Sequence, residues 1–475
     1  MRQAIDLREV ENLSRLKAIT ARPGFFVFLF GLLFAGLMFQ ALPRTLRGPR
    51  GAADFEHFYE ASKALAAGAD IYAGDSQHYI YPPLLALLLR PLSLIPLSAA
   101  AGAWLLLNGG LLAAAAWLSA RAAASRLDCS ARDHLIAQAA ILGSLLLLIE
   151  IHSDLHLGQS DGLVLFALVL ALNCLDKRPI MAGLFLGLAG AIKYIALAYI
   201  PYLVLRRRWR AAASSAAGWV GWMLLPSISV GWTRNLNYIA RAVAGLFAMS
   251  DPNVGSARPG TSPALGTLAG ISGVVWERSV SLTSAVMRHM GTHPGKIWAI
   301  AALLGLAVIC LAFAWLLVRK SRFTLWAGRG LPADAQVASS RALVLGEWSA
   351  VLTATLLFSP QLTERHFVLL LPVTVLASFL FLIAGRFIER FVLGVGTVLL
   401  VAGLYLPPGG IARWETALAW WRDIGGLSWC ALLFFFSVFA ILLRLLADNR
   451  RRSSEVFDLP RPAAPSTSNT PAVDI

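Results

Sequence analysis

Apolar residues fill the chain in blocks of about twenty, separated by short segments rich in basic residues, proline or glycine. An α-helix needs about twenty such residues to cross the hydrocarbon core of a bilayer. The first block, residues 24–42, is followed by no small-residue cleavage site, so we interpret it as a transmembrane helix rather than a cleaved signal. Ten further candidate spans are residues 99–120, 135–151, 163–175, 181–205, 211–230, 297–318, 342–358, 367–383, 391–406 and 427–446. The pattern predicts an all-α polytopic membrane protein.

Composition agrees with this pattern. Of 475 residues, 57% are hydrophobic and 14% are charged, whereas a soluble protein carries about a quarter charged residues. In a soluble protein the net charge of +15 would suggest nucleic-acid binding, but here many basic residues stand in short runs at the ends of the apolar blocks. The four cysteines are scattered, so no disulfide framework or metal cluster is predicted. We expect neither a metal nor a cofactor.

Runs of Lys and Arg predict which helix ends face the cytoplasm. Lys177 and Arg178 precede a stretch of about 27 mostly apolar residues, and three arginines at 206–208 follow it. Both runs can face the cytoplasm only if the stretch enters and leaves on that side, as two half-helices that turn around residues 191–193. With this turn the chain makes about 12 membrane passes and keeps both termini in the cytoplasm.

This topology divides the chain into three parts. Residues 1–23 form a cytoplasmic N-terminal segment, residues 24–447 a transmembrane domain, and residues 448–475 a disordered cytoplasmic tail. Outward-facing loops are predicted at residues 43–80, 152–161, 231–295, 359–366 and 407–426. The cytoplasmic loop at 319–341 is too short for a nucleotide-binding domain, and the chain has no phosphate-binding glycine motif. A cytosolic ATP or nucleotide-sugar site is therefore not expected.

The first outward loop carries the sequence Asp54-Phe-Glu-His-Phe-Tyr-Glu60 and ends near Tyr81-Pro-Pro. Asp54 and His57 are three residues apart, so a short helix would present a carboxylate and an imidazole on one face. The alternative is an amphipathic loop helix whose charges only keep it solvated.

A second acidic cluster spans residues 150–161, with three carboxylates, two imidazoles and no cation. Acids at a membrane boundary are costly unless they are paired or used. Gln159 and Asp161 can hydrogen-bond a sugar hydroxyl, or Asp161 can cap the following helix. A third interpretation is metal binding by His152, Asp154 and His156, although the spacing of these residues is not specific to metal sites.

Two further features place cations where they need a partner. Lys193 lies deep in an apolar run, where an ammonium group costs at least about 2.5 kcal/mol, so we expect it at the outward tip of the half-helices, facing an anionic headgroup. Snorkelling to the interface is the alternative. Arg365 offers a planar donor fork that suits phosphate, and His366 can transfer protons near neutral pH; an ordinary wet loop is the other reading.

The order of these motifs resembles glycosyltransferase family 87. The resemblance rests on Asp54-Phe-x-x-Phe-Tyr, Tyr79-x-Tyr-Pro-Pro-Leu-Leu-Ala, Gly158-Gln-Ser-Asp161 and Gly183-Leu-Phe-Leu-Gly-Leu-Ala-x-x-x-Lys193, and it resumes at Ser359-Pro360. It implies a GT-C-like bundle with a catalytic first extracytoplasmic loop. It also implies transfer of a sugar from a polyprenyl-phosphate donor to a lipid or glycan acceptor, in a bacterial plasma (inner) membrane, at the extracytoplasmic face.

The resemblance also implies roles for individual residues. Asp54 would be the general base of an inverting transfer, and His366 would orient the phosphate or the acceptor. The other implied contacts are Lys193 and Arg365 with the donor phosphate, and Glu56, His57, Tyr81, Gln159 and Asp161 with the sugar or acceptor. The later motif of the family, roughly Ser-Pro-x-Ser-Trp-x-His-His, reads Ser359-Pro-Gln-Leu-Thr-Glu-Arg-His366 here, without the Trp and the first His. Mannose is the expected sugar, with arabinofuranose and others left open.

A function of another class stays open beside this one. A secondary transporter, or a flippase for lipids or lipid-linked sugars, would also place a lysine such as Lys193 in a broken helix. The chain shows no obvious repeated halves, and its acidic and aromatic first loop exceeds what a carrier needs. Substitution of Asp54 separates the two readings, because only the transferase depends on it.

Overall fold

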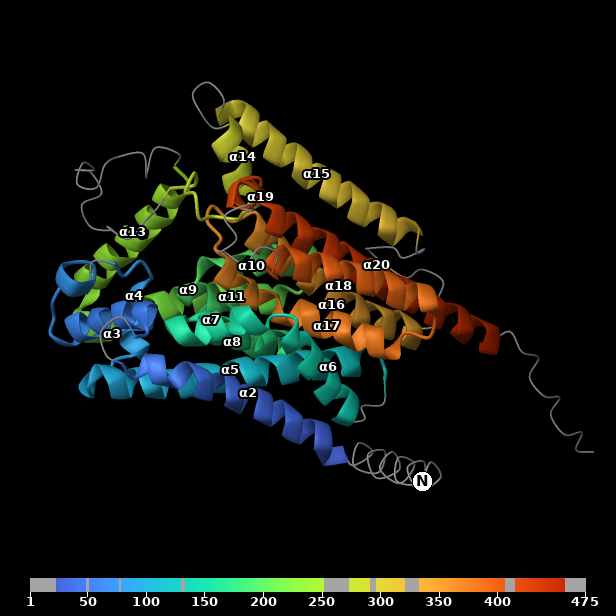
Figure 1. Cartoon of the computed structure of the whole chain (residues 1–475), viewed down its shortest axis with the longest axis horizontal. Helices are drawn as coiled ribbons and strands as arrows, with labels where there is room; N and C mark the ends of the chain where they lie inside the picture. Colours follow the sequence, from blue (N-terminus) through green and yellow to red (C-terminus); the bar gives the residue numbers. More distant parts are fainter. Residues whose placement is uncertain are drawn as a thin grey trace, which may run out of the picture.

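The computed structural model describes residues 23–47, 51–76, 78–129, 133–251, 273–290, 296–320, 333–405 and 415–457. Within these ranges the chain is helical and contains no strand (Figure 1). The predictions for residues 1–22, for residues 252–272 and 291–295 of the 231–295 loop, and for the tail after residue 457 lie outside the described residues. Residues 448–457, predicted as the start of a disordered tail, instead continue the last helix, Gly426–Phe457.

The α-helices are α2 (Pro23–Thr45), α3 (Ala53–Ala66), α4 (Pro83–Leu88), α5 (Leu97–Arg126), α6 (Asp133–Leu145), α7 (Leu148–Leu157), α8 (Asp161–Cys174), α9 (Pro179–Ile192), α10 (Tyr199–Leu205), α11 (Trp209–Leu224), α12 (Ser227–Val230), α13 (Trp232–Met249), α14 (Leu282–Met290), α15 (Lys296–Lys320), α16 (Ala333–Leu357), α17 (Leu371–Ile383), α18 (Phe387–Tyr405), α19 (Glu415–Asp423) and α20 (Gly426–Phe457). Four 3₁₀ segments join them: η1 (Gly74–Ser76), η2 (Leu92–Leu94), η3 (Tyr194–Ala198) and η4 (Glu364–Leu370).

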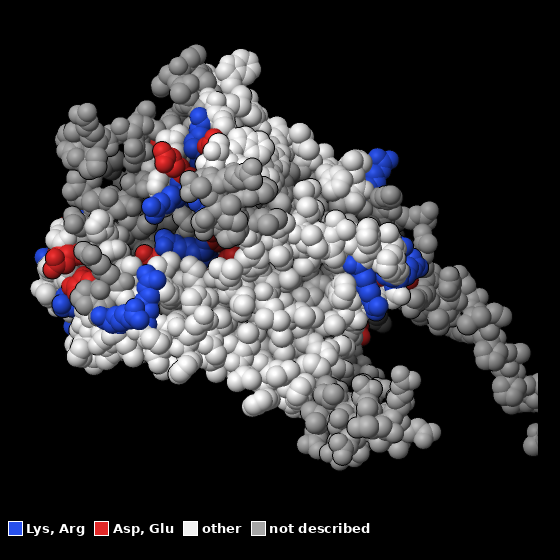
Figure 2. Space-filling view, in the orientation of Figure 1, with Lys and Arg blue, Asp and Glu red and all other residues white. Residues whose placement is uncertain are grey.

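Six helices of the described ranges are long and apolar enough to cross a membrane: α2, α5, α15, η4 with α17, α18 and α20. Figure 2 shows that the Lys, Arg, Asp and Glu side chains of one face gather toward the two ends of the bundle and leave its middle uncharged. The prediction of an all-α polytopic membrane protein is confirmed, and the count of 12 passes stays a prediction. The apolar stretch predicted as one span at 135–151 is divided between α6 and α7, which bend by 73°.

The predicted turn of two half-helices is confirmed. Helix α9 ends at Ile192, Lys193 is extended (φ −132°, ψ 124°), and η3 and α10 follow. Helix α11 runs parallel to α9, because Gly183 faces Ala211 and Gly187 faces Trp219, so the chain between them must run back. Arg208 Nη1 then lies 2.8 Å from Asp176 Oδ1, which places the two basic runs at the same end of the bundle.

Close packing of α9 against α11 depends on these two glycines. A Cβ atom would lie 2.6 Å from the carbonyl oxygen of Ala211 at position 183, and 2.5 Å from the backbone nitrogen of Trp219 at position 187. Small residues one turn apart let helix backbones approach closely in a membrane. The pair holds the broken helix, and therefore Lys193, in place.

The first loop packs into the bundle rather than lying free in solvent. Phe55, Phe58 and Leu65 of α3 are buried, and the ring of Phe55 stacks on Trp104 of α5 with centroids 5.9 Å apart. Tyr79 Oη donates a hydrogen bond to the carbonyl oxygen of Pro82 over 2.6 Å, just before Pro83 starts α4. The alternative of a solvated loop helix therefore does not hold for α3.

Part of the 231–295 region supports the 359–366 loop. The backbone nitrogen of Val280 donates to the carbonyl oxygen of Leu362 over 2.7 Å, and Thr283 Oγ1 donates to that of Phe358 over 2.8 Å. These bonds tie α14 and the segment before it to the chain that enters η4. They fix the position from which Arg365 and His366 project.

Candidate active site

Asp54 lies in the first turn of α3, in contact with two other parts of the chain. Its Oδ2 atom accepts a hydrogen bond from Gln159 Nε2 and forms an ion pair with Arg365 Nη1 at 2.8 Å. The Asp54 and Arg365 side chains are 22% and 30% exposed. Three of the predicted site residues, from three separate segments, therefore meet at one carboxylate.

The turn after α7 brings Gln159 to Asp54. Gly158 ends the helix in the left-handed region (φ +69°), where a residue without a Cβ atom is favoured. A Cβ atom here would also lie 2.6 Å from Cβ of Phe55 on α3. Trp104 Nε1 donates to the carbonyl oxygen of Gly158 over 3.0 Å and fixes the turn from α5.

Asp161 begins α8 and is fully buried. Its Oδ1 atom pairs with Lys193 Nζ, and its Oδ2 atom lies 2.7 Å from His366 Nδ1. The N-cap position of α8 is Ser160, which makes no side-chain capping bond, so the alternative that Asp161 caps the helix does not hold. The negative charge is still favourable here, since the N-terminal end of a helix is the positive end of its dipole.

Lys193 occupies the break between α9 and η3, with 15% of its side chain exposed. Besides its ion pair with Asp161, its Nζ atom lies 5.6 Å from the centre of the Tyr81 ring, within the range of a cation–π contact. Burial raises the pKa of the Tyr81 hydroxyl, which Lys193 opposes, so this side chain is a neutral donor. Lys193 is held by a carboxylate and an aromatic face rather than snorkelling to the surface.

Next to these charges lies Asn108, a residue that the sequence did not indicate, paired with Asp154. Asn108 of α5 donates through Nδ2 to Asp154 Oδ2 over 2.7 Å and to the carbonyl oxygen of Gln159 over 3.1 Å. Both side chains are completely buried. The available signal was one amide in an otherwise apolar span. Asn108 connects the acidic helix α7 to the residue that contacts Asp54.

The remaining predicted residues lie beside this cluster. Glu56 follows Asp54 by two positions, so the two point to different faces of α3. The His57 ring is 5.1 Å from that of His78, and burial together with His78 lowers the pKa of His57. The described residues contain no group of three or more His, Cys, Asp or Glu that could hold a metal ion.

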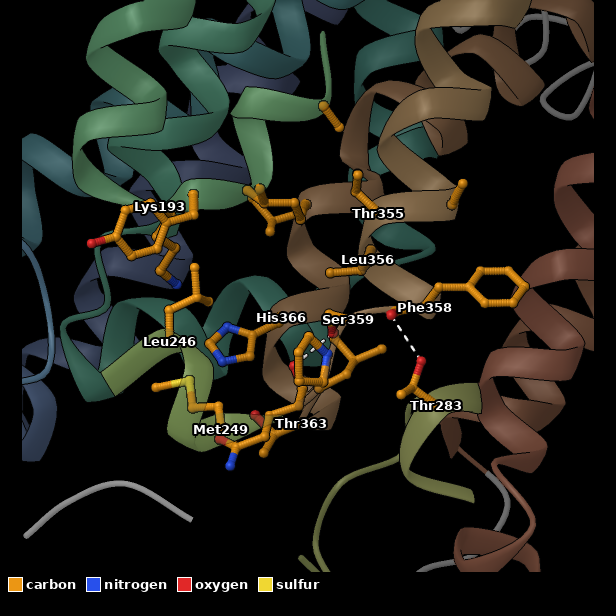
Figure 3. A pocket seen from close by; sticks show the side chains of 18 of the residues that line it. Lys193, Leu246, Met249, Thr283, Thr355, Leu356, Phe358, Ser359, Thr363 and His366 are labelled. Atoms are coloured by element: carbon orange, nitrogen blue, oxygen red, sulfur yellow. Dashed lines mark hydrogen bonds between the residues drawn. The ribbon is translucent and has the colours of Figure 1, made fainter. Parts of the chain in front are cut away.

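A cavity of about 1070 Å³ opens beside the cluster. Lys193, Arg365 and His366 line it, together with apolar side chains of α13, α15 and α16. Figure 3 shows Lys193 and His366 facing the same space as Leu246 and Met249 of α13. The site thus combines cations and a long apolar wall, which suits an amphipathic anion.

The fold and the site define a polytopic membrane protein with an ionic cluster at one end of an apolar cavity. The chain belongs to glycosyltransferase family 87: the sequence model of that family matches residues 79–333, more than half of its length. The family predicted from the motifs is therefore confirmed, and the protein is a membrane glycosyltransferase. The match includes Tyr81, Gln159, Asp161 and Lys193, whereas Asp54 and the pair Arg365 and His366 lie outside it.

A solved structure with a similar chain is that of ArnT from Cupriavidus metallidurans bound to undecaprenyl phosphate. It shares 15% sequence identity, the TM-score is 0.43, and the alignment covers 91% of this chain and 79% of that one. No curated protein matches the sequence.

Proposed function

We propose that this protein transfers a sugar, mannose by expectation, from a polyprenyl-phosphate donor to a hydroxyl group of a lipid or glycan acceptor. The observation that carries the proposal is the position of Lys193, Arg365 and His366 on the wall of an apolar cavity. The polyprenyl chain would lie along α13, α15 and α16. Its phosphate would then reach the cations, and no nucleotide site is needed because the donor is already activated.

The electrostatics suit a phosphate that becomes a leaving group. Lys193, Arg365 and His366 line the cavity, and Asp161 binds Lys193 and His366. Donors fixed where negative charge develops stabilise a transition state without reorganisation, and they act more strongly in a site of low dielectric constant. Asp161 has both oxygens occupied, so we propose it as a positioning residue rather than as a ligand of the sugar.

Asp54 would act as the general base. As the acceptor oxygen forms its bond to the anomeric carbon, Asp54 takes the hydroxyl proton, and the bond from that carbon to the phosphate oxygen breaks with its electron pair on the phosphate. Attack opposite to the leaving group inverts the configuration at the anomeric carbon. His57, on the face of α3 that carries Asp54, and Glu56, on another face, would contact the sugar or acceptor, and Tyr81 and Gln159 would contact the sugar or hold Asp54.

The setting of the reaction is part of the proposal. With the basic runs in the cytoplasm, the end of the bundle that carries Asp54 would face the extracytoplasmic side, and both termini would lie in the cytoplasm of a bacterial cell. The twelve-pass GT-C-like topology fits this orientation, because the half-helices return to the side from which they entered.

A transporter or flippase for lipid-linked sugars is the second candidate. Lys193 at a break in a helix, beside a large cavity, is the observation that favours it, because transporters bind substrates at discontinuous helices. Such a protein would move the lipid without changing it and would not require Asp54.

The test uses purified protein in liposomes with radiolabelled polyprenyl-phosphate-mannose and a lipid extract from the source cells. We expect label to enter new lipids with the wild type, and Asp54→Asn to lower the rate about 10²- to 10⁴-fold, the typical contribution of a general base. Glu60→Gln is the matched control, because it removes a carboxylate from the same helix at a surface ion pair with Lys63. Equal transfer by Asp54→Asn, or no transfer with mannose and arabinofuranose donors alike, would favour the second candidate.

A further inference from the structure

Arg365 joins the catalytic carboxylate to the cavity. Its Nη1 atom is 2.8 Å from Asp54 Oδ2, while the residue also lines the cavity, of which Asp54 is not a wall residue. Its Nε atom is buried and has no hydrogen-bond partner in the described part of the chain. One edge of the guanidinium group is thus engaged with Asp54, and another has donor capacity to spare.

In this structure both described donors to Asp54 converge on one of its two oxygens. That oxygen, Oδ2, accepts from both Gln159 and Arg365. A base that takes a proton from an acceptor hydroxyl needs that lone-pair capacity. Where Oδ2 is the oxygen that takes the proton, its contact with Arg365 has to weaken first.

A phosphate in the cavity would compete with Asp54 for Arg365 and so weaken the contact between the two residues. The guanidinium fork binds phosphate oxygens with two parallel hydrogen bonds, whereas the pair with Asp54 uses one nitrogen at 2.8 Å. The pair is also partly exposed, with 22% and 30% of the two side chains accessible, so neither partner is locked by burial.

We propose that Arg365 exchanges partners during the reaction: it binds Asp54 in the empty enzyme and the phosphate in the donor-bound enzyme. Asp54 becomes a free base only once the donor is in place, so the donor binds productively before the acceptor. This inference rests on the proposed function and adds an order of binding to it. It also assigns Arg365 a second role, as the residue that keeps the base inactive without a donor.

The exchange makes an unusual prediction about affinity. If Asp54 and the phosphate compete for Arg365, removing the charge of Asp54 must strengthen phosphate binding, although the same change abolishes transfer. The probe is a radiolabelled short-chain polyprenyl phosphate without a sugar, and its dissociation constant is measured with protein in lipid nanodiscs. We expect Asp54→Asn to bind it about 5- to 20-fold more tightly than the wild type, within the usual range of coupling between two sites.

A double-mutant cycle distinguishes the exchange of partners by Arg365 from direct repulsion between the Asp54 charge and the phosphate. In an Arg365→Gln background, Asp54→Asn should change the dissociation constant by less than about twofold, because the shared partner is gone. Glu60→Gln removes the same charge from α3 without touching Arg365 and should have no effect. If Arg365→Gln does not fold, Arg365→Lys keeps the cation but loses the fork and should also reduce the effect of Asp54→Asn.

The outcomes distinguish this inference from the function beneath it. Equal or weaker binding by Asp54→Asn would overturn the exchange, and so would equal tightening with and without the Arg365 side chain. Wild-type protein that binds no polyprenyl phosphate would overturn the proposed function itself. Binding by the wild type with no response to Asp54→Asn would leave the donor class standing and remove only the exchange.

Discussion

The two ion pairs of the site have similar chemistry and opposite environments. Asp161 is fully buried, and its two oxygens hold Lys193 and His366. Asp54 is 22% exposed, and a single oxygen takes both of its described donors, Gln159 and Arg365. Burial fixes the first group, because an unpaired charge there would be costly, while the second can change partners at small cost. The site thus combines a fixed pair, Asp161 with Lys193, and an adjustable pair, Asp54 with Arg365.

Removal of the buried carboxylate should have the largest effect on stability. Asp161→Asn leaves Lys193 as an uncompensated charge in the protein, and we expect a loss of about 3–5 kcal/mol in unfolding free energy. Asp54→Asn should lose less than about 1 kcal/mol, since its pair is partly exposed. Thermal unfolding in detergent, with both variants measured beside the wild type, checks the difference. Similar losses in the two variants would contradict the contrast between them.

A paired substitution sharpens the same comparison. Replacing both partners of a buried ion pair by apolar residues is often neutral or stabilising. Asp161→Leu with Lys193→Met should therefore recover most of the stability that Asp161→Asn loses, yet transfer should remain absent because the cation at the cavity is gone. Recovery of transfer together with stability would show that Lys193 serves the fold alone.

Asn108 supports the adjustable pair through Gln159, and its removal should have a smaller effect on stability. Asn108→Leu removes the donor that binds Asp154 Oδ2 and the carbonyl oxygen of Gln159. A buried group left without its partner costs about 1–3 kcal/mol, so the variant should be less stable by that amount. Because Gln159 also loses its anchor, we expect transfer to fall while binding of polyprenyl phosphate is unchanged. Equal losses of binding and transfer would instead indicate damage to the cavity.

The sequence predicted the charged residues of the site better than their partners. Lys193 stands out because a charge deep in an apolar run needs an explanation. Asp54, Arg365 and His366 stand out as ionisable groups in predicted outward loops. Their pairing depends on how distant segments meet, and no local pattern reports that. Asn108 was missed because one amide in an apolar helix looks like an ordinary polar position.

The fold shows the same limit. The turn at Lys193 could be predicted, because basic runs on both sides of one apolar stretch leave few solutions. The 73° bend between α6 and α7 could not, because it falls at consecutive leucines and not at a proline or glycine. Hydropathy reports whether a segment prefers lipid, but says nothing about where packing bends it.

The smallest predicted effect concerns the loop that carries Arg365. Thr283→Val keeps the shape of the side chain but removes the hydroxyl that donates to the carbonyl oxygen of Phe358 over 2.8 Å (Figure 3), whereas Thr283→Ser keeps that donor. The lost bond should cost about 0.5–1.5 kcal/mol. The loop sets where Arg365 meets both Asp54 and the phosphate. We therefore expect the KM for the donor to rise at least about twofold, with kcat less affected. A loss of about 0.5 kcal/mol in donor binding corresponds to roughly a factor of two. Steady-state kinetics on both variants test this. If the valine and serine variants behave alike, the bond does not position Arg365, and the adjustable pair depends on contacts within its own cluster.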